Sequence, residues 1–296
     1  MSALTSAGGT RRLDVELVRR GLVRSRGQAR ELLDAGAVVV DGVVTSRPSA
    51  PVADETHLEL RHEPDHWVGR AAHKLLGALD AFGPEGLVVD RRRCLDVGAS
   101  TGGFTQVLLE RGASQVTALD VGHGQLVPLI AQDPRVSELS GTNIRDVHPG
   151  ELGAPYDLVV ADLSFISVRL ALPSMVEQTD PRGDLVLLVK PQFEVGRDNI
   201  GRTGVVGSTL ERRRVLRDVV AAARALGLRV RGLVRSPLRG GDGNREYLLW
   251  VTRRPDQDVV GGDVDALIDL AESTESTEST DSTESTESTE SVEGTP

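Results

Sequence analysis

The pattern of hydrophobic and polar positions begins with a small group of helices and strands. Two short helical patterns and two β-branched runs are predicted over residues 13–22, 28–34, 37–40 and 43–45. Asp41-Gly42 joins the β-branched runs, and this dipeptide is typical of a tight hairpin turn. The pattern predicts a small α+β domain over residues 11–62, preceded by a disordered end at residues 1–10.

After a linker at residues 63–68, the pattern changes to alternating helices and strands. Strands are predicted at residues 94–97, 116–121, 157–162, 185–189, 228–234 and 247–252, with a weaker one ending near Asn143. Helices are predicted at residues 69–82, after Gly102, and at residues 125–132, 168–178 and 209–226. Because several strands are nearly continuous apolar runs, we expect an α/β domain over residues 69–255 with a parallel sheet covered on both faces.

The end of the chain has a different composition. Glu-Ser-Thr repeats cover residues 272–290 and contain almost no apolar side chain. Such a segment cannot bury enough apolar surface to offset the entropy of an ordered chain. We therefore predict a disordered acidic tail over residues 256–296.

The charge is divided unevenly along the chain. The net charge is −10, yet residues 255–296 hold 13 acidic residues and no basic one, so the rest of the chain carries +3. Residues 11–30, which include most of the predicted N-terminal helices, hold seven arginines, namely Arg11, Arg12, Arg19, Arg20, Arg24, Arg26 and Arg30. A solvated charged surface explains such a cluster, but a basic face on a small domain favours a nucleic-acid partner.

Cysteine usage and hydropathy narrow the range of cellular compartments expected for this protein. Cys94 is the single cysteine, so no intrachain disulfide can form. The sequence has no apolar run of membrane-spanning length and no signal-peptide pattern at its start. These features argue against secreted and membrane proteins, and we expect a cytoplasmic protein.

Lysine is rare in this chain. Arginine outnumbers lysine 32 to 2, and the two lysines are Lys74 and Lys190. A buried lysine can lose its proton, whereas arginine effectively cannot. From composition alone, chance survival and a chemical role explain the two lysines equally well.

A glycine-rich turn marks a candidate cofactor site. Gly98, Ser100 and Gly102 follow the strand at residues 94–97, where glycines permit a tight turn and a close approach of the backbone to a ligand. The spacing differs from the dinucleotide fingerprint, and Asp96 would lie near any phosphate. Asp120 ends the next strand and is placed to accept hydrogen bonds from a ribose. These features favour S-adenosylmethionine, and a purely structural turn is the alternative.

Two charged residues end neighbouring predicted strands. Asp162 and Lys190 would point into one crevice, because ligands of open α/β sheets bind beyond the carboxyl ends of the strands. Taken singly, Asp162 could cap a helix and Lys190 could be an edge charge. Glu246, at the start of the last strand, reaches the same cleft or pairs with an exposed arginine. The glycine-rich residues 196–207 are either a lid or a surface loop.

Several motifs together resemble a known family. The glycine-rich turn, Ala161-Asp162, Val189-Lys190-Pro191 and Arg245-Glu246-Tyr247, with Lys74 upstream, resemble the Lys-Asp-Lys-Glu set of FtsJ-like ribose 2′-O-methyltransferases. The N-terminal module resembles the RNA-binding fold of ribosomal protein S-four. With the Arg70-Ala-Ala-His-Lys-Leu and Asp162-Leu-Ser-Phe-Ile-Ser motifs, residues 11–255 are similar to the TlyA family of rRNA cytidine 2′-O-methyltransferases, which are often labelled haemolysins.

The resemblance implies a fold and a set of roles. It implies a Rossmann-like, seven-stranded methyltransferase domain after a small α+β RNA-binding domain, with ribosomal RNA within ribosomal subunits as partner. The implied catalytic residues are Lys74, Asp162, Lys190 and Glu246. The implied cofactor residues are Gly98, Ser100, Gly102, Asp120 and Asn143, the last on the adenine side. Both lysines of the chain fall where the family has lysine.

These roles suggest a mechanism without a metal. Lys190, if neutral, takes the proton of the 2′-hydroxyl, and a second ammonium (Lys74) and exclusion of water both favour its neutral form. Asp162 orients Lys190, and Glu246 holds Lys74. Phe165 and Phe193 are candidates for stacking the target base, although either can be a core residue. The arginines listed above would contact phosphates without selecting a sequence.

Three other functions are alternatives to methyl transfer. A pore-forming haemolysin needs a membrane-inserting segment, and an oxidoreductase needs a dinucleotide fingerprint, which Ser100-Thr101 interrupts. A non-catalytic RNA-binding protein would be expected to lack Lys190 or Asp162. One departure from the family is Asp65, which stands where the short linker motif of the family opens with arginine.

Overall fold

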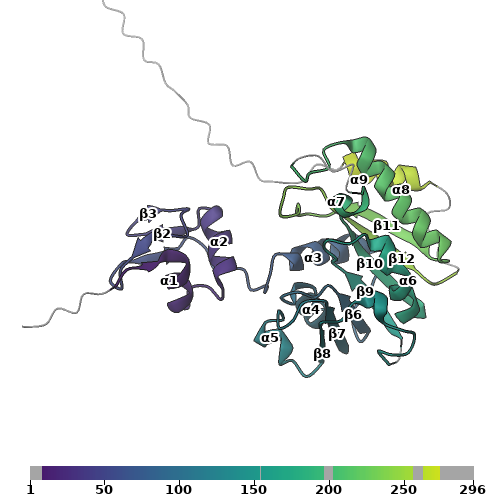
Figure 1. The fold of residues 1–296 in the computed structure, drawn as a ribbon, viewed down its shortest axis with the longest axis horizontal. Helices are drawn as coiled ribbons and strands as arrows, with labels where there is room; N and C mark the ends of the chain where they lie inside the picture. The colour runs from purple at the N-terminus through teal and green to yellow at the C-terminus, as the bar shows by residue number, and fades with distance from the viewer. Residues whose placement is uncertain (1–8, 154, 197–202, 256–262, 274–296) are drawn as a thin grey trace, which may run out of the picture. The chain divides into compact units, whose positions relative to one another are not determined.

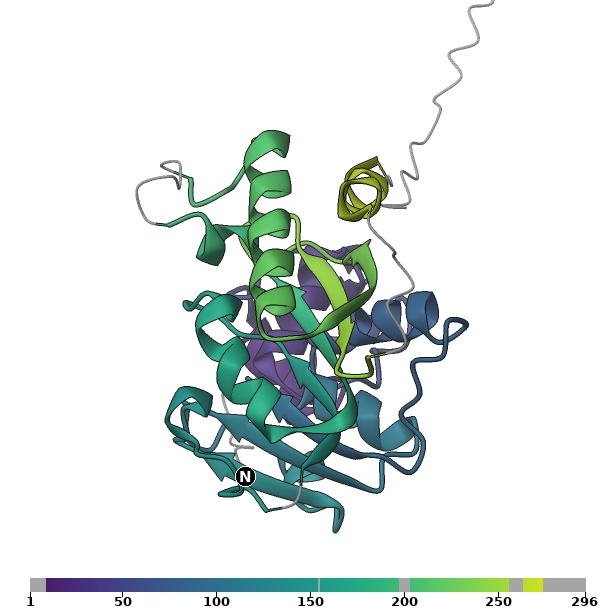
Figure 2. The ribbon, with the colours of Figure 1, turned by 90° about the vertical axis from the view of Figure 1, so that its right-hand side faces the viewer.

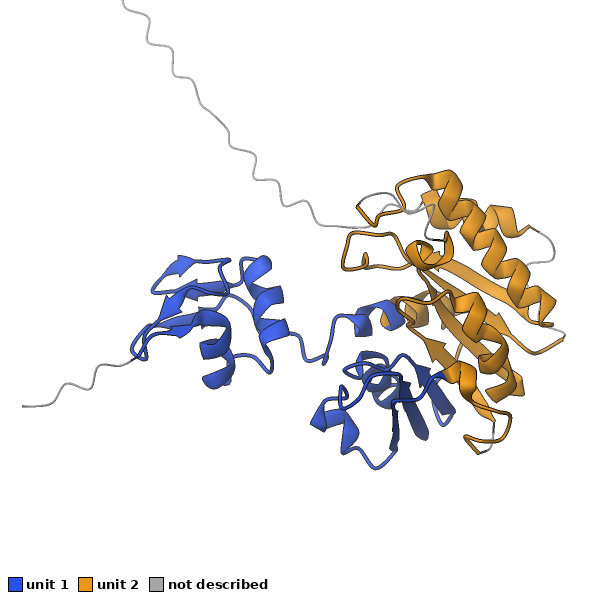
Figure 3. Cartoon of the chain, viewed as in Figure 1, with its two compact units in different colours: residues 1–75, 89–143 blue, residues 76–88, 144–296 orange. Residues whose placement is uncertain are grey.

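The structure, a computed structural model, describes residues 9–153, 155–196, 203–255 and 263–273. The chain forms two compact units (Figure 3). Unit 1 contains residues 1–75 and 89–143, and unit 2 contains residues 76–88 and 144–296. Outside the described residues lie residues 1–8 of the end predicted to be disordered (residues 1–10), the centre of the glycine-rich loop, and residues 256–262 and 274–296 of the predicted acidic tail.

The N-terminal part of unit 1 is a small α+β domain (Figure 1). Its elements are β1 (Arg11–Arg12), α1 (Leu13–Arg19), α2 (Arg26–Asp34), β2 (Val38–Val40), β3 (Val43–Val44), β4 (Pro51–Val52) and β5 (Leu58–Leu60). β1 pairs with β4, and β2 lies between β3 and β5 with both pairs antiparallel. Leu13, Leu17, Leu33 and Val38 form a fully buried core. This arrangement agrees with the predicted helices and hairpin.

Two predicted helix boundaries move for local reasons. α1 ends at Arg19 because Gly21, with φ +70°, turns the chain and the Leu22 amide bonds back to Leu17. α2 begins at Arg26 because the Ser25 side chain accepts a hydrogen bond from the Gln28 amide, as the predicted capping box requires.

A seven-stranded sheet has the order β11-β12-β10-β9-β6-β7-β8. Unit 1 contributes β6 (Arg93–Val97), β7 (Gln115–Asp120) and β8 (Val136–Ser140), which are parallel, with α4 (Gly103–Glu110) and α5 (Pro128–Ala131). The helix predicted over residues 125–132 shrinks to α5, because Pro128 keeps Val127 extended.

Unit 2 contributes the other strands, β9 (Tyr156–Ala161), β10 (Thr179–Val189), β11 (Arg229–Arg235) and β12 (Tyr247–Thr252). Its helices before the C-terminal segment are α6 (Val168–Gln178), α7 (Pro191–Glu194) and α8 (Thr209–Ala225), with a 3₁₀ turn η1 at Ile144–Asp146. β9 and β10 are parallel, but β12 is antiparallel to both β10 and β11. The prediction of a wholly parallel sheet is therefore wrong at this edge, because residues 236–246 contain no crossover helix.

Both faces of β12 are covered. All six of its residues are buried, although neighbouring side chains point to opposite faces. On one face the ring of Phe82, from the end of α3 (Ala71–Phe82), lies 5.6 Å from the ring of Trp250. The near-continuous apolar pattern of this strand is thus explained even though the strand is antiparallel.

A helix occupies part of the predicted disordered tail. α9 (Val264–Ser273) contacts α8 and β11, and Figure 2 shows it in yellow above the strands. Ile268 and Ala271 are buried. The prediction for residues 264–273 is therefore wrong. The stripe Val264, Ile268 and Ala271 has helical spacing, but the acidic composition around it concealed this signal.

Candidate active site

The ends of β9 and β10 bring two predicted residues together. β9 and β10 are parallel neighbours, with Ala161 opposite Leu187, so Asp162 and Lys190 leave the sheet at one edge. Lys190 Nζ lies 2.6 Å from Asp162 Oδ1, and the two side chains are only 9% and 14% exposed. A mostly buried ion pair at the carboxyl edge of a parallel sheet is the expected position for chemistry.

Aromatic side chains flank this ion pair. Lys190 Nζ also donates a hydrogen bond of 2.9 Å to Ser164 Oγ and lies 5.9 Å from the ring centre of Phe193. The rings of Phe193 and Phe165 are 5.5 Å apart. Phe165 is 92% exposed and has a φ of +66°, which a bulky residue rarely adopts. Phe165 is therefore not a core residue, and its position beside Lys190 suits contact with a ligand.

Glu246 reaches the same edge because β12 runs in the opposite direction. Tyr247 lies opposite Val189, so Glu246 directly precedes one strand at the place where Lys190 directly follows the other. The Glu246 side chain is buried. A β-carbon placed on Gly240 would be 2.6 Å from Glu246 Oε1 and 3.6 Å from Gln192 Nε2. A side chain at position 240 would therefore displace the Glu246 carboxylate, and the sequence alone did not single out Gly240 for this role.

Lys74 is described within unit 1. It lies on the first turn of α3 and is buried, with 5% exposure. That Glu246 holds Lys74 in place stays a prediction. In the linker, the Asp65 carboxylate pairs with the His73 ring, and Arg24 donates hydrogen bonds to the Asp65, His66 and Trp67 carbonyls. The position at which this chain departs from the family motif is thus occupied by a local ion pair.

A surface cleft in unit 1 contains the predicted cofactor residues Ser100 and Asp120. It encloses about 200 Å³ including open solvent and is lined by Ala99, Ser100, Ala118, Asp120, Gly122, Gln125, Leu126, Glu138 and Ser140. Gly98 and Gly102 shape the turn beside it, with φ values of +86° and +98°. A β-carbon on Gly102 would meet Leu126 at 2.8 Å, so the turn requires glycine there.

Asp120 organises the floor of the cleft. Its Oδ2 accepts a hydrogen bond from the Ser100 amide (2.8 Å), and its Oδ1 accepts one from the Gly122 amide (2.7 Å). Asp120 Oδ1 also accepts a hydrogen bond from Gln125 Nε2 (3.3 Å). Because a carboxylate has about four acceptor sites, Asp120 retains capacity for one ribose hydroxyl. Among the described residues that line the cleft there is no lysine or arginine, which suits a ligand without phosphates. Asn143 lies just before η1, three residues beyond the end of β8.

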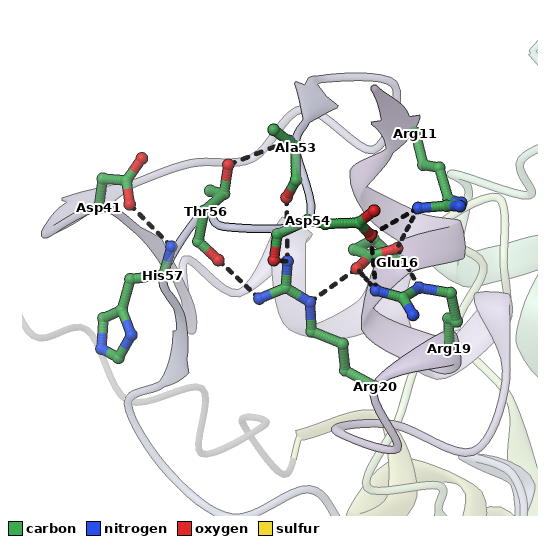
Figure 4. Close-up of polar contacts among 9 residues, drawn as sticks. All are labelled: Arg11, Glu16, Arg19, Arg20, Asp41, Ala53, Asp54, Thr56 and His57. Carbon is green, nitrogen blue, oxygen red and sulfur yellow. Dashed lines mark hydrogen bonds and ion pairs between the residues drawn. The ribbon is translucent and has the colours of Figure 1, made fainter. Parts of the chain in front are cut away.

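Most of the predicted RNA-binding arginines also stabilise their own domain (Figure 4). Arg19 and Arg20 both bond the buried Glu16, and Arg20 also donates to the carbonyls of Ala53, Asp54 and Thr56. These contacts hold the pKa of Glu16 at about 2. Arg11 pairs with Asp54, which Arg19 also contacts.

A second buried carboxylate engages two more of these arginines. Asp14 is buried and accepts hydrogen bonds from Arg12 and Arg26, which hold its pKa at about 2. Arg30 differs from the rest, because it is exposed and has no ion pair or hydrogen bond with any residue that the structure describes. The basic face is therefore less free to bind phosphate than its count of arginines suggests.

The described part of the chain has neither a cluster of metal-ligating side chains nor a membrane-spanning helix. Within residues 9–153, 155–196, 203–255 and 263–273, no group of three or more His, Cys, Asp or Glu side chains is placed to hold a metal ion. Within the same ranges, no helix has the length and hydropathy needed to cross a membrane.

Comparison with known proteins shows the family to which the chain belongs. A family model for FtsJ-like methyltransferases matches residues 67–253, and one for the S4 domain matches residues 11–57. The chain is 50% identical over 247 residues to the 16S/23S rRNA (cytidine-2′-O)-methyltransferase TlyA of Mycobacterium tuberculosis, covering 83% of this chain and 91% of that one. It is 38% identical over 240 residues to a candidate rRNA methyltransferase, YqxC, of Bacillus subtilis, covering 80% and 84%.

A solved structure of a candidate hemolysin from Streptococcus thermophilus is 36% identical, with a TM-score of 0.69, and the match covers 90% of this chain and 97% of that one. The cleft of unit 1 and the Lys190–Asp162 pair thus lie within the part of the chain that the FtsJ-like model matches. The chain belongs to the TlyA family of S-adenosylmethionine-dependent rRNA methyltransferases, which combine an S4 domain with an FtsJ-like domain.

Proposed function

We propose that this protein transfers a methyl group from S-adenosylmethionine to the ribose 2′-hydroxyl of a cytidine in ribosomal RNA. The observation that carries the proposal is the Lys190–Asp162 pair, which is 2.6 Å long and lies at the ends of two parallel strands. The M. tuberculosis relative, named for this reaction on 16S and 23S rRNA, supports the choice of substrate. We infer ribosomal subunits as the partner and the cytoplasm as the compartment.

The bound cofactor supplies an activated methyl group, and the residues of this chain prepare the acceptor. A ribose hydroxyl is a weak nucleophile until its proton is removed or polarised. Lys190, once it has released its own proton, accepts the hydroxyl proton at Nζ. Asp162 and Ser164 fix the position of that nitrogen by their contacts of 2.6 and 2.9 Å. Alignment of the two reactants supplies much of the acceleration.

Lys74 and Glu246 complete the proposed catalytic set. The family resemblance carries their assignment, and the burial of both side chains supports it. A second ammonium from Lys74 favours the neutral form of Lys190. Glu246 orients Lys74, and Gly240 leaves room for the Glu246 carboxylate.

The aromatic pair beside Lys190 suits the target base. Sequence-specific recognition of RNA commonly targets unstacked bases, and proteins hold such bases on aromatic rings. Phe165 is exposed, and its ring lies 5.5 Å from that of Phe193, whose ring is in turn 5.9 Å from Lys190 Nζ. We assign Phe165 as the stacking surface for the extruded base.

The cofactor is assigned to the cleft in unit 1. Gly98, Ser100 and Gly102 surround the methionine end, Asp120 binds the ribose and Asn143 lies on the adenine side. The glycine φ values and the spare acceptor capacity of Asp120 support this fit. The RNA enters over the N-terminal domain, where Arg30 is the arginine most available for phosphate.

The test is methyl transfer from labelled S-adenosylmethionine to purified, unmodified ribosomal subunits. We expect label in rRNA at one linkage that becomes resistant to alkali, and no label with Lys190→Ala, although that variant still binds the cofactor. Failure of the wild-type protein to label either subunit, with cofactor binding intact, would exclude this substrate and favour a non-catalytic RNA-binding role.

A further inference from the structure

Glu272 on α9 forms a buried ion pair next to Tyr247, the first residue of β12. Its carboxylate is 4% exposed and faces Arg212 on α8, which is 5% exposed. Arg212 Nη2 lies 2.8 Å from Glu272 Oε2, and Arg212 Nε lies 3.0 Å from Oε1. Such a two-point contact fixes the orientation of both side chains.

The same guanidinium also binds the chain that precedes α8. Arg212 Nη1 donates to the carbonyls of Val206 (3.1 Å) and Gly207 (2.8 Å), and Nη2 donates to Thr209 Oγ1 (2.8 Å). This segment is the end of the glycine-rich stretch predicted to be a lid or a surface loop. Its described part is held by Arg212, and the position of Arg212 depends on Glu272.

The start of β12 joins the same cluster. The Tyr247 hydroxyl donates to Glu272 Oε1, and Arg212 Nε lies 3.0 Å from that hydroxyl. Nearby, Asn244 Oδ1 accepts from the Val206 amide (2.9 Å) and Asn244 Nδ2 donates to the Gly204 carbonyl (3.0 Å). Polar contacts therefore connect Asn244 and Tyr247, on the two sides of Glu246, to residues 204–207.

Electrostatics favours the charged state of this cluster. Burial acts to raise the pKa of Glu272, but hydrogen bonds from Arg212 and Tyr247 outweigh it and hold that pKa below its ordinary value. Burial and the neighbouring carboxylate raise the pKa of Tyr247, so its hydroxyl remains a donor. A buried ion pair of this kind adds little stability relative to apolar side chains of the same volume. What it supplies is the orientation of particular groups.

We propose that Glu272 is a positioning residue for the methyl transfer. Through Tyr247 and Arg212 it fixes the backbone at Glu246 and the adjoining residues 204–207. The helix α9 is then a functional part of the methyltransferase, although it lies beyond the matched FtsJ-like residues 67–253. The catalytic consequence rests on the proposed function, whereas the ordering of these segments by Glu272 does not.

The test compares Glu272→Gln with Asp269→Asn. Both substitutions remove one negative charge from α9, but Asp269 is 58% exposed and pairs with Arg213 on the surface. For Glu272→Gln, amide hydrogen exchange should accelerate at least about 10-fold at residues 204–209 and 244–247, and not in β9 or β10. With subunits as substrate, kcat should fall at least about 10-fold, since small misplacements are costly in catalysis. KM and the cofactor Kd should stay within about twofold. Glu272→Asp should restore part of the rate, and Asp269→Asn should match the wild type.

Two results would overturn the proposal. One is an amide hydrogen-exchange rate equal to that of the wild type at residues 204–209 and 244–247 in folded Glu272→Gln. The other is a kcat of this variant equal to that of the wild type. If Glu272→Gln does not fold, Tyr247→Phe replaces it, because this change removes one hydroxyl and leaves the Arg212–Glu272 pair. A wild-type kcat and wild-type exchange in Tyr247→Phe would also refute the proposal. If the wild-type protein methylates no rRNA, the proposed function fails, and the exchange data decide the positioning role alone.

Discussion

Tyr247 lies opposite Val189 in the antiparallel pair of β10 and β12. This register places Glu246, which precedes a strand, at the same sheet edge as Lys190, which follows one. In a wholly parallel sheet the two residues would lie at opposite edges, because parallel strands begin at one edge and end at the other. The direction of β12 is therefore part of the site.

Replacing Lys190 with arginine should abolish methyl transfer. Arginine keeps the positive charge opposite Asp162 but cannot release a proton at working pH. We expect kcat to fall at least about 100-fold, the usual range for loss of a general base, while the cofactor Kd stays unchanged. Single-turnover methylation of ribosomal subunits measures this. Ser164→Ala, which removes one contact to Nζ, is the milder comparison. A Lys190→Arg enzyme with near-normal turnover would show that Lys190 is not the base.

A methyl group on Gly240 should disturb Glu246 selectively. The added carbon would be 2.6 Å from Glu246 Oε1, too close for the carboxylate to stay in place. We expect Gly240→Ala to lower kcat about 10-fold or more with little change in the thermal midpoint. Gly207→Ala is the control, because no atom lies within 4 Å of the added carbon there. Equal activities of the two variants would contradict this placement of Glu246.

Changing Asp120 to asparagine should weaken cofactor binding. In asparagine one of the two carboxylate oxygens becomes an NH₂ group, which only donates, so either the Ser100 or the Gly122 amide hydrogen bond (2.8 and 2.7 Å) is lost. Hydrogen bonds to charged groups contribute about 1.5–3 kcal/mol, so we expect the cofactor Kd to rise about 10- to 100-fold in isothermal titration calorimetry. Asp133→Asn removes the same charge away from the cleft and should bind as the wild type does. Normal affinity of Asp120→Asn would place the ribose elsewhere.

Arg30 and Arg20 should differ in what they contribute. Arg30 is exposed and has no internal partner among the described residues, so Arg30→Ala should weaken RNA binding and reduce the slope of log K against log salt by about 0.9. The stability of the N-terminal domain should not change in Arg30→Ala. Arg20 bonds Glu16 and three backbone carbonyls, so Arg20→Ala should lower the denaturant midpoint of the N-terminal domain. RNA titrations at several salt concentrations and urea unfolding distinguish the two. The reverse pattern would argue against this division of roles.

The N-terminal domain should lose stability in acid. The pKa of Asp14 is about 2 in the folded protein against an ordinary value of 3.8, and that of Glu16 is about 2 against an ordinary 4.5. A lowered folded-state pKa stabilises the fold above the unfolded pKa, and this contribution disappears as pH falls towards the folded value. The stability contributed by these carboxylates should thus be complete above about pH 5 and vanish between about pH 4.5 and 2.

Hydrogen exchange at residues 13–17 measures this dependence. Asp14→Asn should be less protected than the wild type at pH 6, and the difference should close as the pH approaches 2, after correction for the intrinsic exchange rate. A difference that does not change with pH would mean that the ion pairs with Arg12 and Arg26 do not stabilise the folded domain.

Local chemistry was sufficient for much of the architecture. α6 (Val168–Gln178) and β12 (Tyr247–Thr252) have the predicted bounds, because a continuous apolar pattern and a capping serine are properties of neighbouring residues. The glycine-rich turn after β6 is local in the same way. Its positive backbone angles favour glycine whatever surrounds the turn, although Leu126 also leaves no room for a β-carbon at Gly102.

Local patterns in the sequence are therefore enough to predict the order of the elements, the residues at the strand ends and the resemblance to a family. The direction of β12, the exposure of Phe165, the folding of α9 and the use of the N-terminal arginines as internal partners became visible in the folded chain. The physical reason is that these properties depend on contacts between residues far apart in the chain. Arg212 meets Glu272 across 60 positions, and no local pattern records such a pairing.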